Sequence, residues 1–175
     1  MIKKISIGIT ILVVLSLAWY LLSPLWKMKE ANKPSPLQTL SALSPDMREQ
    51  FDTAMEEANR TVLGVMDTMP ANPHVLAKGN FIGDVHDVGG TALLIESGGT
   101  HILRLENFET LNGPDLHIYL ARAEKNDDIV DLGKIKATKG NVNYAITKEV
   151  NFQEYHRVLV FCVPFKVLFG HADLH

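Results

Sequence analysis

The chain has 175 residues, enough for one domain with a short appendage, because two full domains would each have only a small core. Its net charge of -3 comes from interspersed lysines, arginines and carboxylates. No basic stripe could neutralise a row of phosphates, which argues against nucleic acid as a partner. The hydrophobic content of 46% is ordinary for a globular protein, but part of it is concentrated near the N-terminus.

This N-terminal apolar run predicts a membrane anchor. Residues 5–22 carry no charge, and Leu25 and Trp26 extend the run to the length that crosses a hydrocarbon core of about 30 Å. Trp19 and Tyr20 lie near the downstream end, where aromatic rings prefer the membrane interface. We therefore expect a transmembrane helix within residues 1–26 and the lipid bilayer as a partner.

The charges around this run bear on two questions: whether it is cleaved as a signal peptide, and which side of the membrane the rest of the chain faces. Lys3 and Lys4 precede it, as in a cleaved signal peptide, but no small-x-small cleavage pattern follows, which favours an uncleaved anchor. Lysines lie on both sides, so the count of positive charges is nearly balanced. Because the four-residue leading tail cannot hold a domain, we expect a single-pass protein with an extracytoplasmic C-terminal domain.

A proline-containing stalk and an amphipathic helix follow the anchor. Residues 27–43 are polar and suit an extended spacer, and residues 44–76 are expected to form the helix and a linker. The run Ser44-Pro45-Asp46 predicts an N-cap, an N1 proline and an acidic first turn. Apolar residues that recur at helical spacing are expected to pack against a neighbour: Met47, Phe51, Met55, Ala58, Val62 and Met66. Gly64 and the prolines at 70 and 73 are expected to end the segment.

Residues 77–175 alternate short apolar runs with turn residues, which predicts a mainly β domain, an antiparallel β-sandwich or barrel-like fold. The expected strands are 77–82, 91–96, 101–108, 115–121, 130–136, 141–147, 156–163 and 166–171. Residues 158–163 are apolar at every position, which indicates a strand covered on both faces. Cys162 would share one face with Val158 and Val160.

Cys162 is the only cysteine, so an intramolecular disulfide is excluded. The absence of a Cys-x-x-Cys pattern likewise excludes a dithiol couple and covalently attached haem. No positive group adjoins Cys162 in the sequence to favour the thiolate. Two interpretations stay open: a small buried side chain of the core, or a redox group that needs a partner thiol, a metal or a radical.

Histidines offer a metal site as an alternative. Cys162 with His117 and His171 would form the ligand set of two histidines and one cysteine that suits copper electron transfer. The long gap between Cys162 and His171 and the lack of a following methionine argue against this site. The run Asp84-Val85-His86-Asp87 could contact a cation or form a solvated turn.

No triad with an elbow glycine, phosphate-binding glycine loop or pair of carboxylates supports a hydrolase or nucleotide enzyme. Whether the protein is an enzyme at all therefore stays open.

Several ordered blocks resemble the DM-thirteen domain, a Skeletor-associated family described as an electron-transfer domain. The blocks are Gly79-Asn80-Phe81, Gly90-Thr91-Ala92, Leu103-Arg104-Leu105-Glu106-Asn107-Phe108, Asn112-Gly113-Pro114-Asp115-Leu116, Tyr119-Leu120, Leu132-Gly133-Lys134-Ile135-Lys136, Gly140-Asn141, Tyr144, Val160-Phe161-Cys162 and Phe169-Gly170-His171-Ala172-Asp173-Leu174. The resemblance implies a β-rich fold and a redox role for a cysteine near the C-terminal end, which is Cys162 here. A tryptophan often precedes that cysteine in the family, whereas Phe161 stands here.

The leading hypothesis is therefore a membrane-anchored DM-thirteen-like protein that transfers electrons or redox equivalents through Cys162, with a redox partner outside the cytoplasm. The alternative from a different class is a non-enzymatic adhesion or scaffolding module, in which Cys162 belongs to the core. A third hypothesis is a metal carrier that uses histidines with Cys162. The cofactor is unknown, and copper is the weak candidate.

Overall fold

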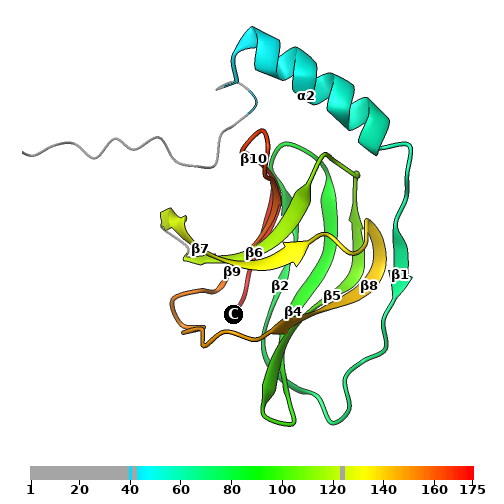
Figure 1. The fold of residues 1–175 in the computed structure, drawn as a ribbon. Helices are drawn as coiled ribbons and strands as arrows, with labels where there is room; N and C mark the ends of the chain where they lie inside the picture. The colour runs from blue at the N-terminus through cyan, green and yellow to red at the C-terminus, as the bar shows by residue number, and fades with distance from the viewer. Residues whose placement is uncertain (1–39, 41–42, 123–124) are drawn as a thin grey trace, which may run out of the picture. The chain divides into compact units, whose positions relative to one another are not determined.

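A computed structural model describes residue 40 and residues 43–122 and 125–175. In these residues the chain is mainly β and forms two sheets that pack face to face (Figure 1). The first sheet has the order β1-β8-β5-β4-β2, with bounds Gly64–Met66, Lys139–Ile146, Thr100–Thr110, Val88–Ser97 and His74–Asn80. The second has the order β3-β10-β9-β6-β7, with bounds Ile82–Gly83, Val167–Asp173, Arg157–Cys162, Leu116–Arg122 and Lys125–Lys134.

The eight expected strands all form, and they correspond to β2 and to β4 through β10. The mainly β prediction is thus confirmed, with sandwich-like packing of the two sheets. The strands pair antiparallel except for β1, which runs parallel to β8. The short strands β1 and β3 were not expected from the sequence.

The core fills the space between the sheets. Alternate residues of the central strands point inward and are buried, among them Leu94, Leu103, Leu105, Phe108, Ile118, Leu120, Val158, Val160 and Phe169. Strand β9 lies between β10 and β6 and is buried on both faces. Its outward residues Leu159 and Phe161 join Tyr119 and Ala121 in a second apolar cluster. The strand is apolar at every position because both of its faces are buried, as the sequence pattern predicted.

Helix α2, Pro45–Ala58, begins as its capping residues predict. Ser44 has extended backbone geometry, and its hydroxyl accepts a hydrogen bond from the Met47 amide at 3.3 Å. Pro45 occupies the first turn, and Asp46 places a negative charge near the amino end of the helix. Phe51 and Met55 are its buried residues.

The helix is shorter than the apolar spacing predicted, and the docking role expected of Met47, Val62 and Met66 is wrong. Val62 and Met66 lie beyond the helix and are 70% and 76% exposed, and Met47 is 38% exposed. Residues 64–66 instead pair with β8, an interaction with a distant strand that helical spacing cannot reveal.

A buried arginine also holds the chain after β1. Arg104 of β5 is 4% exposed and donates hydrogen bonds to the Asp67 and Thr68 carbonyl oxygens at 3.1 and 3.2 Å. These bonds fix residues 67–68 against the first sheet, so this segment cannot continue the helix.

The predicted transmembrane segment, residues 5–22, lies outside the described residues, as does nearly all of the predicted stalk. Within the described ranges, none of the helical structure has the length and apolar character required to span a bilayer.

One side of the sandwich is closed where β2 meets the end of the chain. The Lys78 amide donates to the His175 carbonyl oxygen at 3.1 Å, and the His175 amide donates to the Lys78 carbonyl oxygen at 3.0 Å. Gly79 permits this approach, because a Cβ atom there would lie 2.0 Å from the Asp173 carbonyl oxygen. The closure therefore requires a residue without a side chain at position 79.

Replacement of Gly79 by alanine should destabilise the domain by about 2 kcal/mol, because the added methyl group forces β2 away from Asp173. Urea unfolding followed by far-UV circular dichroism measures this change. Gly89→Ala is the matched control, since a Cβ atom at Gly89 meets no other atom within 4 Å. Equal unfolding midpoints for the two variants would contradict the close approach.

Candidate functional site

Cys162 is the last residue of β9 and points into the space between the sheets. It lies opposite Leu116 of β6 and Val167 of β10, and its inward neighbours on β9 are Val158 and Val160. Its exposed fraction is 0%. The predicted shared face with the two valines is confirmed, and the sulfur is sealed from solvent.

The thiol is a hydrogen-bond donor in this position. Cys162 Sγ lies 3.0 Å from the carbonyl oxygen of Pro114. Burial raises the pKa of Cys162 to about 11, the backbone amide of Phe165 opposes this, and the charge of Asp115 adds to it. At pH 7 such a thiol is ionised in only about one molecule in ten thousand. The buried group is therefore neutral and unsuited to nucleophilic attack in this state.

Two turns cover the sulfur. The first, residues 112–115, carries the Pro114 carbonyl group and ends at Asp115, which has a positive φ of 49°. The second, residues 163–166, follows β9 directly and is joined to the first by a 3.2 Å hydrogen bond from the Val163 amide to the Asp115 carbonyl oxygen. Displacement of either turn would therefore bring solvent closer to Cys162.

His117 belongs to a charged cluster on the outer side of the second sheet. Its Nδ1 lies 3.0 Å from both carboxylate oxygens of Asp131, and its Nε2 lies 3.6 Å from Asp115 Oδ1. Lys134 Nζ lies 2.6 Å from the same Asp115 oxygen. Lys134, with a smaller contribution from His117, holds the pKa of Asp115 below its usual value. Both ring nitrogens of His117 therefore face carboxylates, and Lys134 supplies a positive charge beside Asp115.

His171 is also engaged by a carboxylate. Its Nδ1 lies 2.7 Å from Asp84 Oδ2. Asp84 is exposed and lies beside β3, whose residue Ile82 is opposite His171 in the sheet. The pair links the short edge strand β3 to β10, and this structural role accounts for the position of His171.

The predicted copper ligands are not brought together. His117 lies opposite Phe161 and His171 lies opposite Leu159, so both histidines lie on the outward face of the second sheet. Cys162 points to the inward face. In the part of the chain that the structure describes, no three histidine, cysteine, aspartate or glutamate side chains are grouped to hold a metal ion. A copper site of Cys162, His117 and His171 is therefore not formed here.

The side chains of residues 84–87, the candidate cation site, contact two separate parts of the protein. Asp84 binds His171, whereas His86 packs its ring against Phe169 at a centroid distance of 4.4 Å. Burial lowers the pKa of His86, although Asp87 and Asp52 favour its charged form. The run therefore contributes to packing rather than to one ion site.

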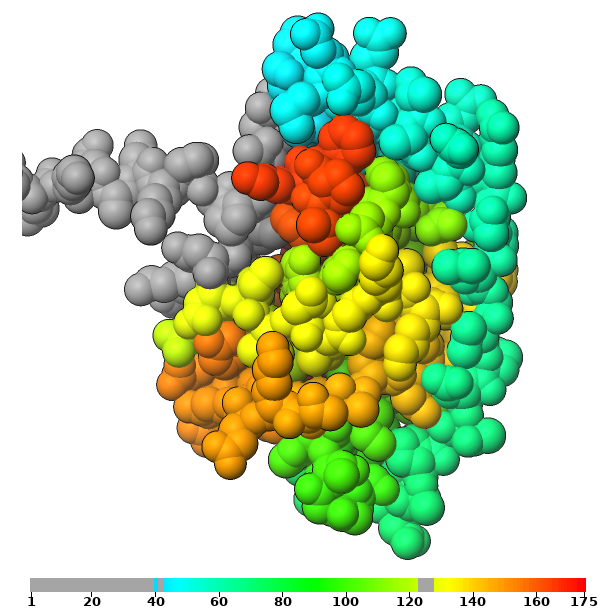
Figure 2. All heavy atoms as spheres, in the orientation of Figure 1, coloured from blue at the N-terminus to red at the C-terminus, as the bar shows by residue number. Residues whose placement is uncertain are grey.

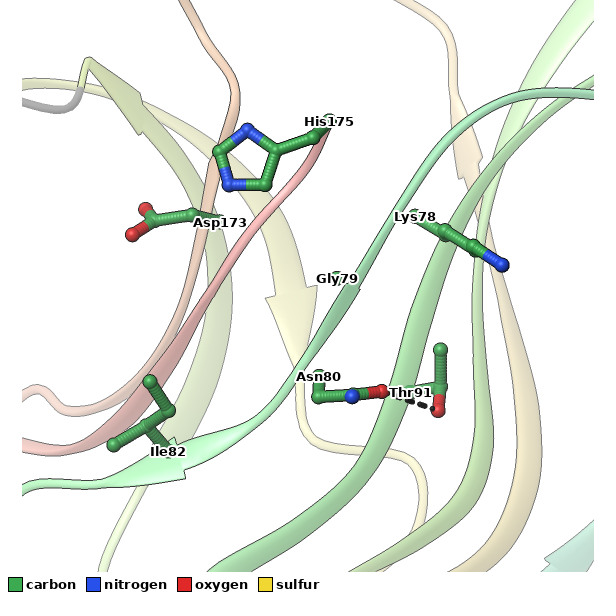
Figure 3. A pocket seen from close by; sticks show the side chains of 7 residues that line it. All are labelled: Lys78, Gly79, Asn80, Ile82, Thr91, Asp173 and His175. Carbon is green, nitrogen blue, oxygen red and sulfur yellow. Dashed lines mark hydrogen bonds between the residues drawn. The ribbon is translucent and has the colours of Figure 1, made fainter.

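A hollow lies near the end of the chain (Figure 3). The residues that line it are Lys78, Gly79, Asn80, Ile82, Thr91, Asp173 and His175. Asp173 accepts hydrogen bonds from Arg157 at 2.6 and 3.0 Å, and Asn80 accepts one from Thr91 at 3.1 Å. Asp173 is thus engaged by Arg157 and Asn80 by Thr91, and no thiol lines the hollow.

Sequence reasoning missed the Pro114 carbonyl group and Asn112, although the turn signal Asn-Gly-Pro-Asp was visible. Asn112 Nδ2 donates to the carbonyl oxygens of Ala58 and Thr61 at 3.0 and 3.1 Å. The sequence indicated a turn at this place but not what the turn contacts.

These observations define a two-sheet β domain that buries one thiol beneath two turns. The family model of electron transfer DM13 matches residues 80–174, more than half of the chain. The chain therefore belongs to the electron transfer DM13 family, as the resemblance of its sequence blocks predicts. Neither a curated protein nor a solved structure matches the chain.

The buried thiol should make stability fall at alkaline pH. The unfolded chain loses the Cys162 proton near the ordinary value of 9.0, whereas the folded chain keeps it until about 11, so stability is full below pH 9 and falls between these values. From pH 8 to pH 10 the native chain should lose about 1 kcal/mol more than Cys162→Ala, as measured by urea unfolding. Parallel pH profiles would contradict the buried neutral thiol.

Proposed function

We propose that this chain is a membrane-tethered electron-transfer domain and that Cys162 is its redox residue. The observation that supports this most is the family match over residues 80–174, which includes the single thiol of the chain. Cys162 also lies at the end of the central strand, next to the turn that carries the Pro114 carbonyl group.

Thiol–disulfide exchange is the redox step that one cysteine can perform without a second cysteine in the chain. The Cys162 thiol gives its proton to water, and its sulfur attacks a disulfide of a partner molecule. The partner disulfide breaks, a mixed disulfide forms, and one partner sulfur leaves as a thiolate. The Cys162 sulfur and the retained partner sulfur share the new bond, and the electron pair of the broken bond leaves with the other partner sulfur. Cys162 is thereby oxidised and the leaving sulfur reduced, formally by one electron each, and the retained partner sulfur keeps its oxidation state. The partner is a disulfide-containing molecule outside the cytoplasm.

The step requires an opened form of the domain. A pKa of about 11 and an exposed fraction of 0% keep the thiol neutral and out of contact with a second molecule. Movement of residues 112–115 or 163–166 would bring water to the sulfur, remove the cause of the raised pKa and admit the partner disulfide.

Oxidised glutathione tests the redox proposal. The folded full chain in detergent should gain one glutathione, detected by intact mass, and Cys162→Ala should gain none. The rate should rise about tenfold for each pH unit between 7 and 9, because the thiolate fraction rises in that proportion. A folded chain that gains no adduct, while the urea-unfolded chain gains one readily, would contradict a redox role for Cys162.

The tether is proposed from the uncharged residues 5–22, and the C-terminal domain is proposed to face outward. The full chain should stay with membranes after an alkaline carbonate wash. The double substitution Val14→Lys and Leu15→Lys should release it, because two charges at the centre of the span oppose insertion. Ser16→Ala is the control that should stay bound. A native chain that the wash removes, or a domain that protease cannot reach on intact cells, would contradict the tether or its orientation.

A non-enzymatic adhesion or scaffolding module is the second candidate. The burial of Cys162 and its hydrogen bond to Pro114 favour it, because a neutral thiol in the core explains the residue by packing alone. The glutathione experiment separates the two candidates, since a core cysteine reacts only when the whole domain unfolds.

A further inference from the structure

Helix α2 lies across the end of the sandwich at which the two turns cover Cys162 (Figure 1). In the space-filling view, atoms of α2 lie directly against the segment that begins β10 (Figure 2). The helix is thus an outer layer over the turns, and the sulfur lies beneath both.

Phe51 connects α2 to the second turn. Its ring lies 5.2 Å from the ring of Phe165, at an interplanar angle of 72°, and 6.4 Å from the ring of Phe169. On another side it stacks on His86, with the ring centroids 6.0 Å apart. Phe165 is the residue whose backbone amide interacts with the Cys162 sulfur. Loss of the Phe51 ring would therefore remove a support of the turn that touches the thiol.

Asn112 connects α2 to the first turn. Its side-chain amide donates to the carbonyl oxygens of Ala58 and Thr61, at the carboxyl end of the helix, and its Oδ1 accepts from the Gly113 amide at 3.0 Å. Pro114, two residues later, accepts the hydrogen bond from Cys162. Each of the two turns is thus held to α2 by one side chain.

The attachment of α2 is small. Of its 14 residues, Phe51 and Met55 are the buried ones. A helix held by so little apolar surface opens far more easily than the central strands, which are buried throughout. With Leu43 just before the helix, Phe51 and Met55 are its apolar attachment to the core, and we expect α2 to open without unfolding the sandwich.

We infer that α2 is a removable cover that controls access to Cys162. When α2 is docked, Phe51 and Asn112 hold the two turns closed over the thiol. When it leaves, the turns lose both supports and admit water and solutes. The inference rests on the proposed redox role of Cys162 for its purpose, whereas access itself is measurable with a reagent that needs no redox partner.

The test uses the full chain in detergent at pH 8 and the rate at which iodoacetamide labels the single cysteine, followed by intact mass at increasing urea. Local opening exposes little surface and gives a rate nearly independent of urea, whereas global unfolding gives a rate that rises steeply with urea. Phe51→Ala should raise the urea-independent rate by about tenfold or more. Met47→Ala, on the exposed side of the same helix, should leave it unchanged.

Asn112→Ala provides an independent second variant, because it removes the polar attachment and leaves the Phe51 packing in place. It should also raise the urea-independent rate. The inference is overturned if both variants label at the native rate, or if their rates rise only as far as their lower global stability explains. If both variants label faster but no variant gains glutathione, the cover stands and the redox proposal fails.

Discussion

The inward face of β9 is the constraint on which the arrangement of this domain depends. β9 is the central strand of its sheet, and Val158, Val160 and Cys162 fill the space between the two sheets. Because water cannot reach the last of these residues, its thiol proton must bind a protein acceptor, and the Pro114 carbonyl group is the one in reach. The 112–115 turn therefore supplies the acceptor that the buried thiol needs, while Asn112 and the Val163 amide hold the turn in place.

Burial, more than the charges nearby, determines the protonation state of Cys162. A shift of the Cys162 pKa from 9.0 to about 11 favours the neutral thiol by about 3 kcal/mol. Lys134, the lysine nearest to Asp115 in the cluster around His117, forms an ion pair with Asp115, and the Asp115 charge itself acts against the thiolate. The closed state is thus an inert state, and reactivity of the sulfur requires an opened one.

The parts of the fold that were predictable are those with a local cause. Ser44 caps α2 because its own hydroxyl reaches the Met47 amide, and strands such as β6 follow from alternation of apolar residues. The end of α2 was not predictable, because Leu63 binds Thr138, 75 residues away. The alternation in β6 did contain evidence against the copper site, since His117 falls between two inward residues and Cys162 falls on an inward face. The register of β6 against β9 is needed to show that His117 lies opposite Phe161 and that Cys162 lies opposite Leu116, on the other face of the sheet.

The thiol and its cover come from different parts of the chain. The family match begins at residue 80, so it includes Cys162, Asn112 and Phe165 but not α2. The segment upstream of the family domain therefore supplies the helix, and α2 is the described helix that lies next in sequence to the predicted stalk, residues 27–43. Since Phe51 and Asn112 connect α2 to both turns, a loss of these contacts would act first on the access to Cys162 and only afterwards on the core.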